Sequence, residues 1–311
     1  MDLHENEQIY YGEIRCQAKN KSCRNKGYFS LENGDIVCGV HSRNVKKVEL
    51  PHRNIKEVLE RKSELYDQHE KYVEKIAEQN RKNDVFGQVK LIQMKMRKEV
   101  ELIPGYMNVF PNFRHQNRKD GFGCSSLSPM MLGPVIHNQP DCPPSKNLEN
   151  YHQFSKCFPL EVDEEQNPTL DFVQNRIKGF EDTEPHRHKI LYSHNNLSMK
   201  GIKPLYSLWT NLDGETHAID YISSRQFYCV FYERLASVQE DFKYLKDLVE
   251  EGFNIAIQGY DAFEMGQTED EIETAYLSPH KPFGHERCLM TMLVLNDPSK
   301  YPWNKHKTYD F

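Results

Sequence analysis

Three cysteines and one histidine near the start of the chain constrain its fold more than any other feature. Cys16, Cys23, Cys38 and His41 follow a C-x6-C-x14-C-x2-H pattern within 26 residues. Three thiolates and one imidazole complete a tetrahedral zinc shell, and so short a segment has too little core to fold without a metal. No carboxylate or open ligand position is evident, so the pattern predicts a structural zinc module over residues 1–50. The alternative is three unrelated cysteines and a surface histidine.

Basic residues surround the predicted ligands. They are Lys19, Lys21, Arg24 and Lys26. Residues 1–102 carry 20 Lys and Arg against 17 Asp and Glu, whereas the rest of the chain carries 20 against 29. A basic front and an acidic body suggest that the front has its own partner, and the small excess favours nucleic acid only weakly. The basic side chains are expected either to contact phosphates or simply to be solvated.

A helical linker is predicted after this module. Residues 54–101 contain strong helix formers and no proline, which is typical of helix. Gly87 is expected to divide the segment into helices over residues 54–83 and 88–100. The apolar repeat is too irregular for a coiled coil, so residues 51–102 are predicted to form a solvated linker.

The sequence also indicates a compartment. No stretch of about 18 apolar residues occurs, so no membrane-spanning helix and no membrane partner are expected. The first residues lack the apolar region of a secretory signal. The eight cysteines are therefore expected to be reduced thiols in a protein that is cytoplasmic or nuclear and not secreted.

From about residue 103 the chain becomes rich in proline, glycine and aromatic residues. The irregular segment before the next helix contains Phe122, Arg114 and Arg118. Aromatic planes and cations are what a nucleotide needs, since the planes stack on the base and the cations meet the phosphates. The alternative is that the aromatic side chains belong to the core and the arginines to its rim.

One predicted helix carries a polar stripe. Over residues 147–158, helical geometry places Glu149, Gln153 and Lys156 on one side, opposite the apolar side chains. This stripe is either an ordinary solvated face or the wall of a pocket.

The segment "GFGCSSLSPMMLGPV…KNLENYHQFSK" resembles the signature of the NADAR superfamily, also called the YbiA-like N-glycosidase fold. Leu127 and Ser128 match the family's loop. The helix that follows matches at Glu149, Gln153 and Lys156, with Asn150 in place of the usual histidine.

The C-terminal part resembles the same family, so that the resemblance covers about residues 106–295. It has an apolar strand, "NIAIQGYD", that ends on Asp261, and a final helix that matches at Gly284, Leu289 and Met290. The family's Trp-Gly after the aspartate is absent. Residues 185–222 look like an insertion, with a hairpin predicted around "NLDGE".

The resemblance implies an N-glycoside hydrolase that acts on an ADP-ribose or ribosylated nucleotide, free or attached to a macromolecule. Such a reaction passes through an oxocarbenium-like transition state that a carboxylate stabilises. The resemblance implies catalytic roles for Glu149 and Asp261, a ribose contact for Gln153, and a phosphate contact or a pKa effect on Glu149 for Lys156. The remaining predicted substrate-binding residues are Phe122, Ser128 and Arg114.

In a second interpretation, Glu149 and Asp261 have no catalytic role. Glu149 is then a helix-start acid and Asp261 a turn residue. The chain would be a non-catalytic adaptor that binds a nucleotide or nucleic acid, and the missing Trp-Gly favours this. Its zinc module resembles those of large DNA virus proteins.

The predicted fold class is α+β, with a mainly helical NADAR-like domain over residues 103–311 that contains a few short strands. His186 and His188 in "PHRHK" are expected to lie in a basic surface cluster; the alternative is a phosphate clamp or a metal site, for which no third ligand is in register. The last residues are expected to pack on the surface. The other helices are predicted over residues 168–180, 222–236, 238–251 and 284–294.

Overall fold

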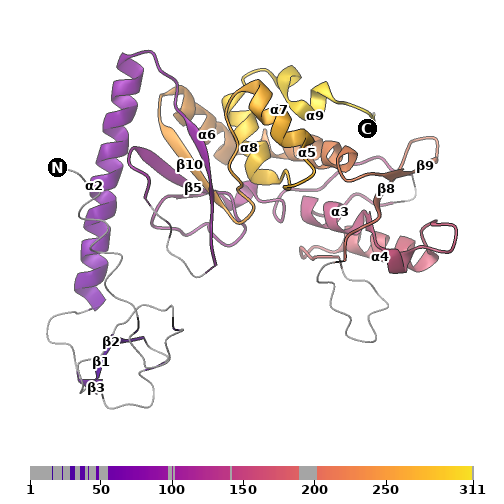
Figure 1. Cartoon of the computed structure of the whole chain (residues 1–311), viewed down its shortest axis with the longest axis horizontal. Helices are drawn as coiled ribbons and strands as arrows, with labels where there is room; N and C mark the ends of the chain where they lie inside the picture. Colours follow the sequence, from indigo (N-terminus) through magenta and orange to yellow (C-terminus); the bar gives the residue numbers. More distant parts are fainter. Residues whose placement is uncertain are drawn as a thin grey trace. The chain divides into compact units, whose positions relative to one another are not determined.

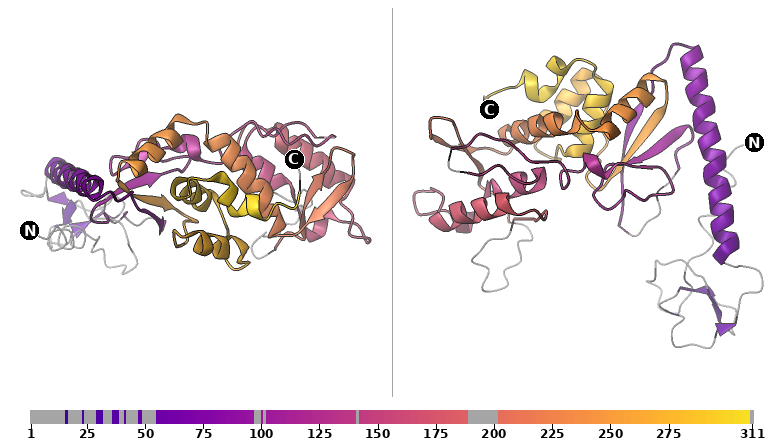
Figure 2. Two further views of the ribbon diagram at one scale, coloured as in Figure 1. Left: turned by 90° about the horizontal axis from the view of Figure 1, so that it is seen from above. Right: turned by 180° about the vertical axis from the view of Figure 1, so that it is seen from behind.

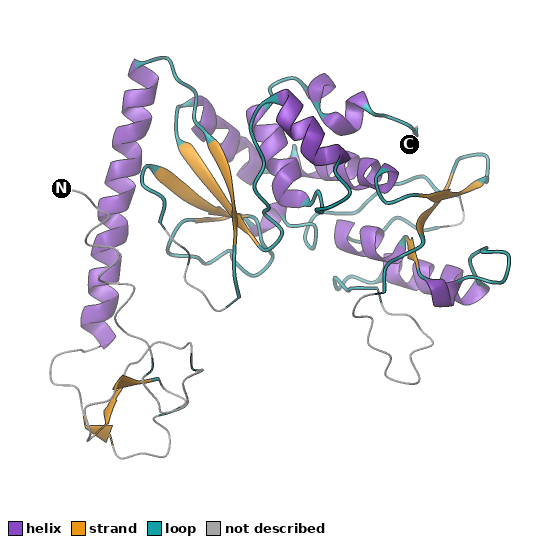
Figure 3. Cartoon of the chain, in the orientation of Figure 1, coloured by secondary structure: helices purple, strands orange, loops and turns teal. Residues whose placement is uncertain are grey.

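The computed structural model describes residues 55–96, 100, 102–140, 142–188 and 202–309, and before residue 55 only residues 16, 23, 29–31, 36–38, 41, 47 and 48. The chain divides into two compact units, Met1–Ile76 with Lys95–Tyr106, and Ala77–Met94 with Met107–Phe311. Helices occupy more of the described chain than strands do, and the sheets are mixed (Figure 3). The predicted α+β class is confirmed.

The first unit contains a small antiparallel sheet in the order β2-β1-β3. Phe29 pairs with Val37 across β1 and β2. Its small core is made of Cys16, Val37 and Cys38, with Cys23 packed against it. The strands are β1 (Phe29–Leu31), β2 (Ile36–Val37) and β3 (Lys47–Val48).

A long helix, α2 (Ile55–Lys82), follows this sheet in the sequence and confirms the first linker helix. Its buried side chains, among those described, include His69, Val73 and Ala77, which lie on one face at spacings of four residues. The Nε2 atom of His69 lies 2.9 Å from the carbonyl oxygen of Tyr106. This face of α2 therefore packs against the rest of the first unit and also makes a buried hydrogen bond.

The second unit has a four-stranded sheet in the order β4-β10-β5-β6, with β10 parallel to β4 (Figure 1). The apolar run of β10 is buried, as expected for a central strand. Asp261 follows this strand, as predicted. The strands are β4 (Val89–Gln93), β5 (Tyr106–Phe110), β6 (Phe122–Gly123) and β10 (Asn254–Gly259).

The helix predicted over residues 88–100 is wrong, because residues 89–93 form β4. Val89 and Leu91 are buried whereas Lys90 between them is exposed, which is the alternation of a strand. Five residues of β4 pair with β10. Long-range pairing therefore overrides the helical propensity of this segment.

The helices of the second unit surround one apolar core that includes Trp303, Tyr232 and Leu148. The predicted helices at residues 168–180, 222–236, 238–251 and 284–294 are confirmed within two residues at each end. Trp303 is fully buried, so the tail inserts into the core instead of lying on the surface. The helices are α3 (Leu148–Phe154), α4 (Leu170–Glu181), α5 (Ser223–Ala236), α6 (Glu240–Glu250), α7 (Glu269–Leu277), α8 (His285–Val294) and α9 (Pro302–Lys305).

A second sheet, β7-β8-β9, lies with α3 and α4 at the end of this unit away from the four-stranded sheet (Figures 1 and 2). β8 and β9 form the hairpin predicted around "NLDGE", and Thr210 pairs with Thr216 across the turn. Gly214 in this turn has a φ of 84°, a conformation that favours glycine. The strands are β7 (Lys156–Cys157), β8 (Tyr206–Thr210) and β9 (Thr216–Ile219).

None of the described helices is long and apolar enough to cross a membrane.

Candidate functional site

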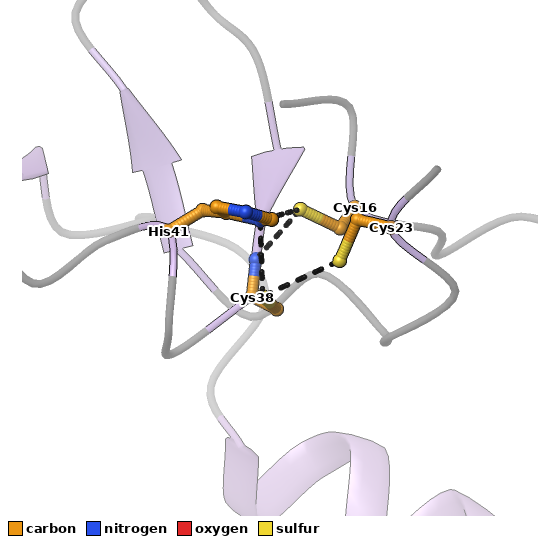
Figure 4. A group of neighbouring side chains, drawn as sticks. All are labelled: Cys16, Cys23, Cys38 and His41. Carbon is orange, nitrogen blue, oxygen red and sulfur yellow. Dashed lines mark hydrogen bonds between the residues drawn. The ribbon is translucent and has the colours of Figure 1, made fainter. Parts of the chain in front are cut away.

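The predicted metal ligands lie together in the first unit (Figure 4). The ligand atoms of Cys16, Cys23, Cys38 and His41 are all within 4.8 Å of one another. The Nδ1 atom of His41 lies 3.2 Å from Sγ of Cys16 and 3.5 Å from Sγ of Cys38. The sulfur atoms of Cys23 and Cys38 are 3.8 Å apart. The structure therefore brings together all four residues that the spacing selected.

Two of these distances, 3.5 Å from His41 to Cys38 and 3.8 Å from Cys23 to Cys38, match those between ligands of a tetrahedral metal ion. With metal–sulfur bonds of about 2.3 Å and metal–nitrogen bonds of about 2.0 Å, as in zinc sites, ligand atoms lie about 3.5–3.8 Å apart. The backbone N–H of Cys38 also donates to Sγ of Cys16 at 3.3 Å, which stabilises a thiolate. The cluster is compatible with a metal such as zinc, and four protein ligands fill its tetrahedron. The nearby basic residues at 19, 21, 24 and 26 lie outside the described residues.

A second candidate site begins at the start of α3. The side chain of Asn147 accepts a hydrogen bond from the backbone N–H of Asn150 at 2.8 Å and so caps the helix. The ring of Tyr151 packs edge-on against Phe231 of α5, with centroids 5.1 Å apart. The cap and this packing hold α3 in place, and Glu149 lies in its first turn.

The three polar residues predicted to share one side of α3 do lie close together, but only Glu149 and Gln153 belong to the helix. The Nε2 atom of Gln153 donates to Oε1 of Glu149 at 3.0 Å. The prediction of a helix as far as residue 158 is wrong, because α3 ends at Phe154 and Lys156 lies in β7. Lys156 still lies close enough to Glu149 for the two charges to interact. We call Glu149, Gln153 and Lys156 the polar trio.

The environment of Lys156 lowers its pKa to about 8. Burial is the largest cause because it disfavours the ammonium form, and the positive charge of Arg187 adds to the shift. The carboxylate of Glu149 opposes it. A large fraction of Lys156 is therefore a neutral amine at slightly alkaline pH, which is unusual for lysine.

Lys156→Met should stabilise the folded protein near neutral pH. Because the pKa of Lys156 is lower in the folded chain than the usual 10.5, its ammonium form destabilises the fold below pH 8, and this penalty fades between pH 8 and 10.5. We expect the free energy of unfolding to rise by about 1–3 kcal/mol at pH 7 and the gain to vanish near pH 10.5. Urea unfolding at both pH values measures this difference, with the exposed Lys146→Met as the control. An equal gain at both pH values would contradict it.

Two aromatic residues beside the trio were not predicted from the sequence. His152 lies on α3 next to the trio, and its ring contacts that of Tyr228 on α5 at 4.9 Å. Burial lowers the pKa of His152 far below its usual value, and the charge of Lys156 adds to this. His152 lies three residues after Glu149 on the same helix, and that spacing was the available signal.

Asp261 lies at the carboxyl end of β10, where its side chain is exposed. A Cβ atom added to Gly284 would lie 4.0 Å from the Cβ of Asp261. Among the described residues, no hydrogen bond or ion pair joins Asp261 to Glu149. The structure thus locates both predicted acids in the second unit and shows no direct contact between them.

A buried carboxylate close to Asp261 was also missed. Glu286 in the first turn of α8 is 1% exposed, and a Cβ atom at Gly259 would lie 2.1 Å from its Oε1. Glycine at position 259 therefore makes room for this carboxylate. Both Glu286 and Glu149 contribute to raising the pKa of Tyr228, after the larger effect of burial. No sequence signal separates Glu286 from an ordinary helix-start acid.

The other predicted substrate-binding residues have separate surroundings. Ser128 is buried, and its Oγ accepts a hydrogen bond from the backbone N–H of Met130 at 3.3 Å. Phe122 is half-buried against Tyr244, with ring centroids 5.0 Å apart, and Arg114 is exposed. The loop of Ser128 does meet the trio's helix, because the backbone N–H of Glu149 donates to Pro129 at 2.9 Å.

The prediction that both histidines of "PHRHK" lie in a surface cluster is wrong for His188. His186 is exposed, but His188 is 6% exposed. Its Nε2 lies 2.6 Å from Oε1 of the buried Glu161, and its Nδ1 lies 3.1 Å from the carbonyl oxygen of Gln153. The buried carboxylate gives the ring a partner and so permits its burial.

Comparisons of this chain with protein-family models, with curated proteins and with solved structures give no match.

Proposed function

We propose that this protein is an N-glycoside hydrolase that acts on an ADP-ribose or ribosylated nucleotide-type substrate at the polar trio. The resemblance of residues 106–295 to the NADAR superfamily supports the reaction type. The observation that carries the proposal is the contact of Glu149 with Gln153 beside the partly buried Lys156. A carboxylate, an amide and an amine in one place provide a charge stabiliser, a hydroxyl ligand and a phosphate ligand.

In the proposed reaction, the bond between ribose C1 and the leaving nitrogen breaks, and its electron pair goes to that nitrogen. The carboxylate of Glu149 stabilises the positive charge that develops on the ribose. A water molecule adds to C1. Asp261 is the proposed acceptor of the proton that this water loses. A leaving nitrogen that departs from an uncharged substrate takes up one proton, whereas nicotinamide leaves NAD⁺ as a neutral molecule and the proton goes to solvent.

Gln153 is proposed to hold a ribose hydroxyl and Lys156 a phosphate. Phe122 and Arg114 are proposed to stack on the base and to meet a phosphate, and Ser128 to position the loop beside Glu149. Both carboxylates act at ribose C1 in this reaction, so it requires the exposed side chain of Asp261 to come within hydrogen-bond reach of the attacking water when the substrate binds.

The test is product analysis with the full-length chain. Free ADP-ribose should appear when the wild-type protein is incubated with NAD⁺, with ADP-ribosylated peptide or with ADP-ribosylated DNA, together with nicotinamide, the unmodified peptide or the unmodified DNA, respectively, as followed by mass spectrometry. Asp261→Asn should reduce the initial rate by about 100-fold, because the water loses its proton acceptor. The exposed Asp171→Asn, in the first turn of α4, is the control. Absence of product from all three substrates would overturn the proposal.

A second function, a metal-bearing adaptor, is favoured by the Cys3His cluster. We propose that its ion is Zn²⁺, because three soft thiolates and one imidazole are typical zinc ligands, and that its role is structural. The module would direct the second unit to a partner, with nucleic acid as the candidate. Absence of turnover, together with nucleic-acid affinity that falls steeply with salt, would favour this function over hydrolysis.

A further inference from the structure

A buried arginine in the second unit has no carboxylate partner among the described residues. Arg176 of α4 is 3% exposed. Its Nη2 atom donates to Oε1 of Gln139 at 2.5 Å and to the carbonyl oxygen of Leu208 at 3.0 Å. Its guanidinium lies 5.2 Å from the ring centroid of Phe180. All three partners are uncharged. Because a buried charge is normally paired with an opposite one, we expect an anion close to this arginine.

The same place holds two hydrogen-bond donors that have no partner in the described chain. They are Nε of Arg176 and Nε2 of Gln139, and both atoms are buried. The Oε1 atom of Gln139 also accepts from the backbone N–H of Thr210 at 2.9 Å, so the amide nitrogen is the unused end of this side chain. Buried polar groups are normally hydrogen-bonded. Two unused donors beside a cation therefore indicate a place for an acceptor oxygen.

A loop folded around His137 brings a cysteine to this arginine. The Nε2 atom of His137 donates to the carbonyl oxygen of Pro143 at 2.9 Å, and its Nδ1 accepts from the backbone N–H of Gln139 at 3.2 Å. Burial lowers the pKa of His137 to about 4, so the imidazole is neutral. The backbone N–H of Cys142 donates to the carbonyl oxygen of Gln139 at 3.3 Å. This turn connects Cys142 to the residue whose side chain holds the guanidinium.

Cys142 is the candidate counter-charge. Burial lowers the pKa of Arg176, whereas the charges of Cys142 and Tyr151 act to raise it, so both groups lie close enough to interact with the guanidinium. Burial raises the pKa of Tyr151 far above its usual value, so its phenol stays uncharged. The neutral imidazole of His137 supplies no negative charge. A neighbouring arginine favours the thiolate form of a cysteine, so the described group that can balance this charge is the sulfur of Cys142.

The thiol of Cys142 is also accessible. It is half-buried, whereas the other cysteines of the second unit are fully buried. Partial exposure and a positive neighbour are the two properties that distinguish reactive cysteines from structural ones. A small reagent can therefore reach this thiol without unfolding the second unit. The fully buried cysteines are Cys124, Cys157, Cys229 and Cys288.

We propose that Cys142 is a thiolate paired with Arg176 and a site of modification by peroxides. The sulfur attacks one oxygen of hydrogen peroxide, the O–O bond breaks, and the leaving hydroxide takes a proton from solvent to become water. The sulfur is oxidised by two electrons to a sulfenate, and the peroxide is reduced. Nε of Arg176 and Nε2 of Gln139 then donate to the sulfenate oxygen. This site does not depend on the proposed hydrolysis.

The first test measures the thiolate in the full-length protein with added zinc. Iodoacetamide reacts with thiolates, so its rate at each cysteine, followed by peptide mass spectrometry, reports the ionised fraction. The pH of half-maximal labelling at Cys142 should lie about one unit or more below that of the same peptide in the urea-unfolded protein, where thiols ionise near about 8.5. A midpoint at or above the unfolded value would overturn the proposal. This measurement needs no substitution.

A matched pair of variants tests the partner. Arg176→Met should reduce labelling of Cys142 at pH 7 by about tenfold or more, because a midpoint shift of one pH unit changes the thiolate fraction by about tenfold. Lys178→Met removes a charge from the exposed side of the same helix and should label like the wild type. The melting temperature shows whether each variant is folded. A folded Arg176→Met that labels at the wild-type rate would refute the pairing, and the wild-type midpoint decides if this variant does not fold.

The peroxide step is tested with dimedone, which traps sulfenates. After treatment with hydrogen peroxide, the wild type should carry the label at Cys142 and not at the four buried cysteines. Glu149→Gln should label equally, because the trio takes no part. A thiolate without a dimedone adduct would refute the peroxide step alone. Asp141 lies outside the described residues, and labelling that is weak in the wild type but appears in Asp141→Asn would assign the counter-charge to this carboxylate and overturn the proposal.

Discussion

Cys38→Ser should remove the metal from the protein and unfold the small sheet of the first unit. Cys38 lies near both His41 and Cys23, at 3.5 and 3.8 Å, so its loss opens the centre of the cluster. The core of this sheet contains Val37 and the cysteines themselves. Structural zinc contributes about 10–16 kcal/mol of binding free energy in such small modules, so little holds the sheet together without the ion.

We expect the zinc affinity of Cys38→Ser to fall by more than about 100-fold, because loss of even an outer hydrogen-bonding partner of a ligand lowers affinity 10–100-fold. Metal analysis after dialysis measures the zinc content, and a chelator titration measures the affinity. NMR signals of Phe29–Leu31 report the sheet. Cys142→Ser, a half-buried cysteine of the second unit, is the control and should retain the full zinc content. A stoichiometric ion in Cys38→Ser would show that the cluster does not hold it.

Glu149→Gln should reduce turnover of the hydrolysed substrate by about 100-fold to 10,000-fold. The change removes the negative charge opposite the developing oxocarbenium ion while preserving the shape of the side chain. The amide oxygen of the new glutamine can still accept the hydrogen bond from Gln153, so the melting temperature should change little. Initial rates at saturating substrate measure the effect.

The matched control is Glu240→Gln. Glu240 also lies in the first turn of a helix, α6, but is exposed and pairs only with Lys243 among the described residues. It should keep full activity. Retention of more than half of the wild-type rate in Glu149→Gln would exclude the trio as the reaction site and leave the adaptor function.

Features set by local spacing could be predicted from the sequence. The spacing of Cys16, Cys23, Cys38 and His41 selected the whole cluster, because the ligands lie within one short hairpin-containing segment. The "NLDGE" turn was predicted because Gly214 supplies the conformation that the turn needs. Helix α4 was predicted from the helical spacing of its apolar residues, and the side chain of Thr169 caps its start, whereas α5, α6 and α8 begin without a side-chain cap.

Features set by long-range contacts could not be predicted. β4 looks helical by composition and becomes a strand only because β10 lies beside it. Lys156 leaves the helix because it pairs with Ser207, about 50 residues further along the chain. The burial of His188 depends on Glu161, and His152 lies against the ring of Tyr228 on α5. Each of these partners is distant in sequence and is not marked by any local pattern.

The position of β4 also decides where the protein can be shortened. Val89–Gln93 precede the boundary at residue 103 suggested by composition, yet they cover one side of β10 in the same sheet. A fragment that starts at residue 103 would expose the backbone amides and carbonyls along the side of β10 that β4 covers. Such an exposed strand edge promotes self-association. Preparations of the second unit alone should therefore begin near Ala77, inside the long helix.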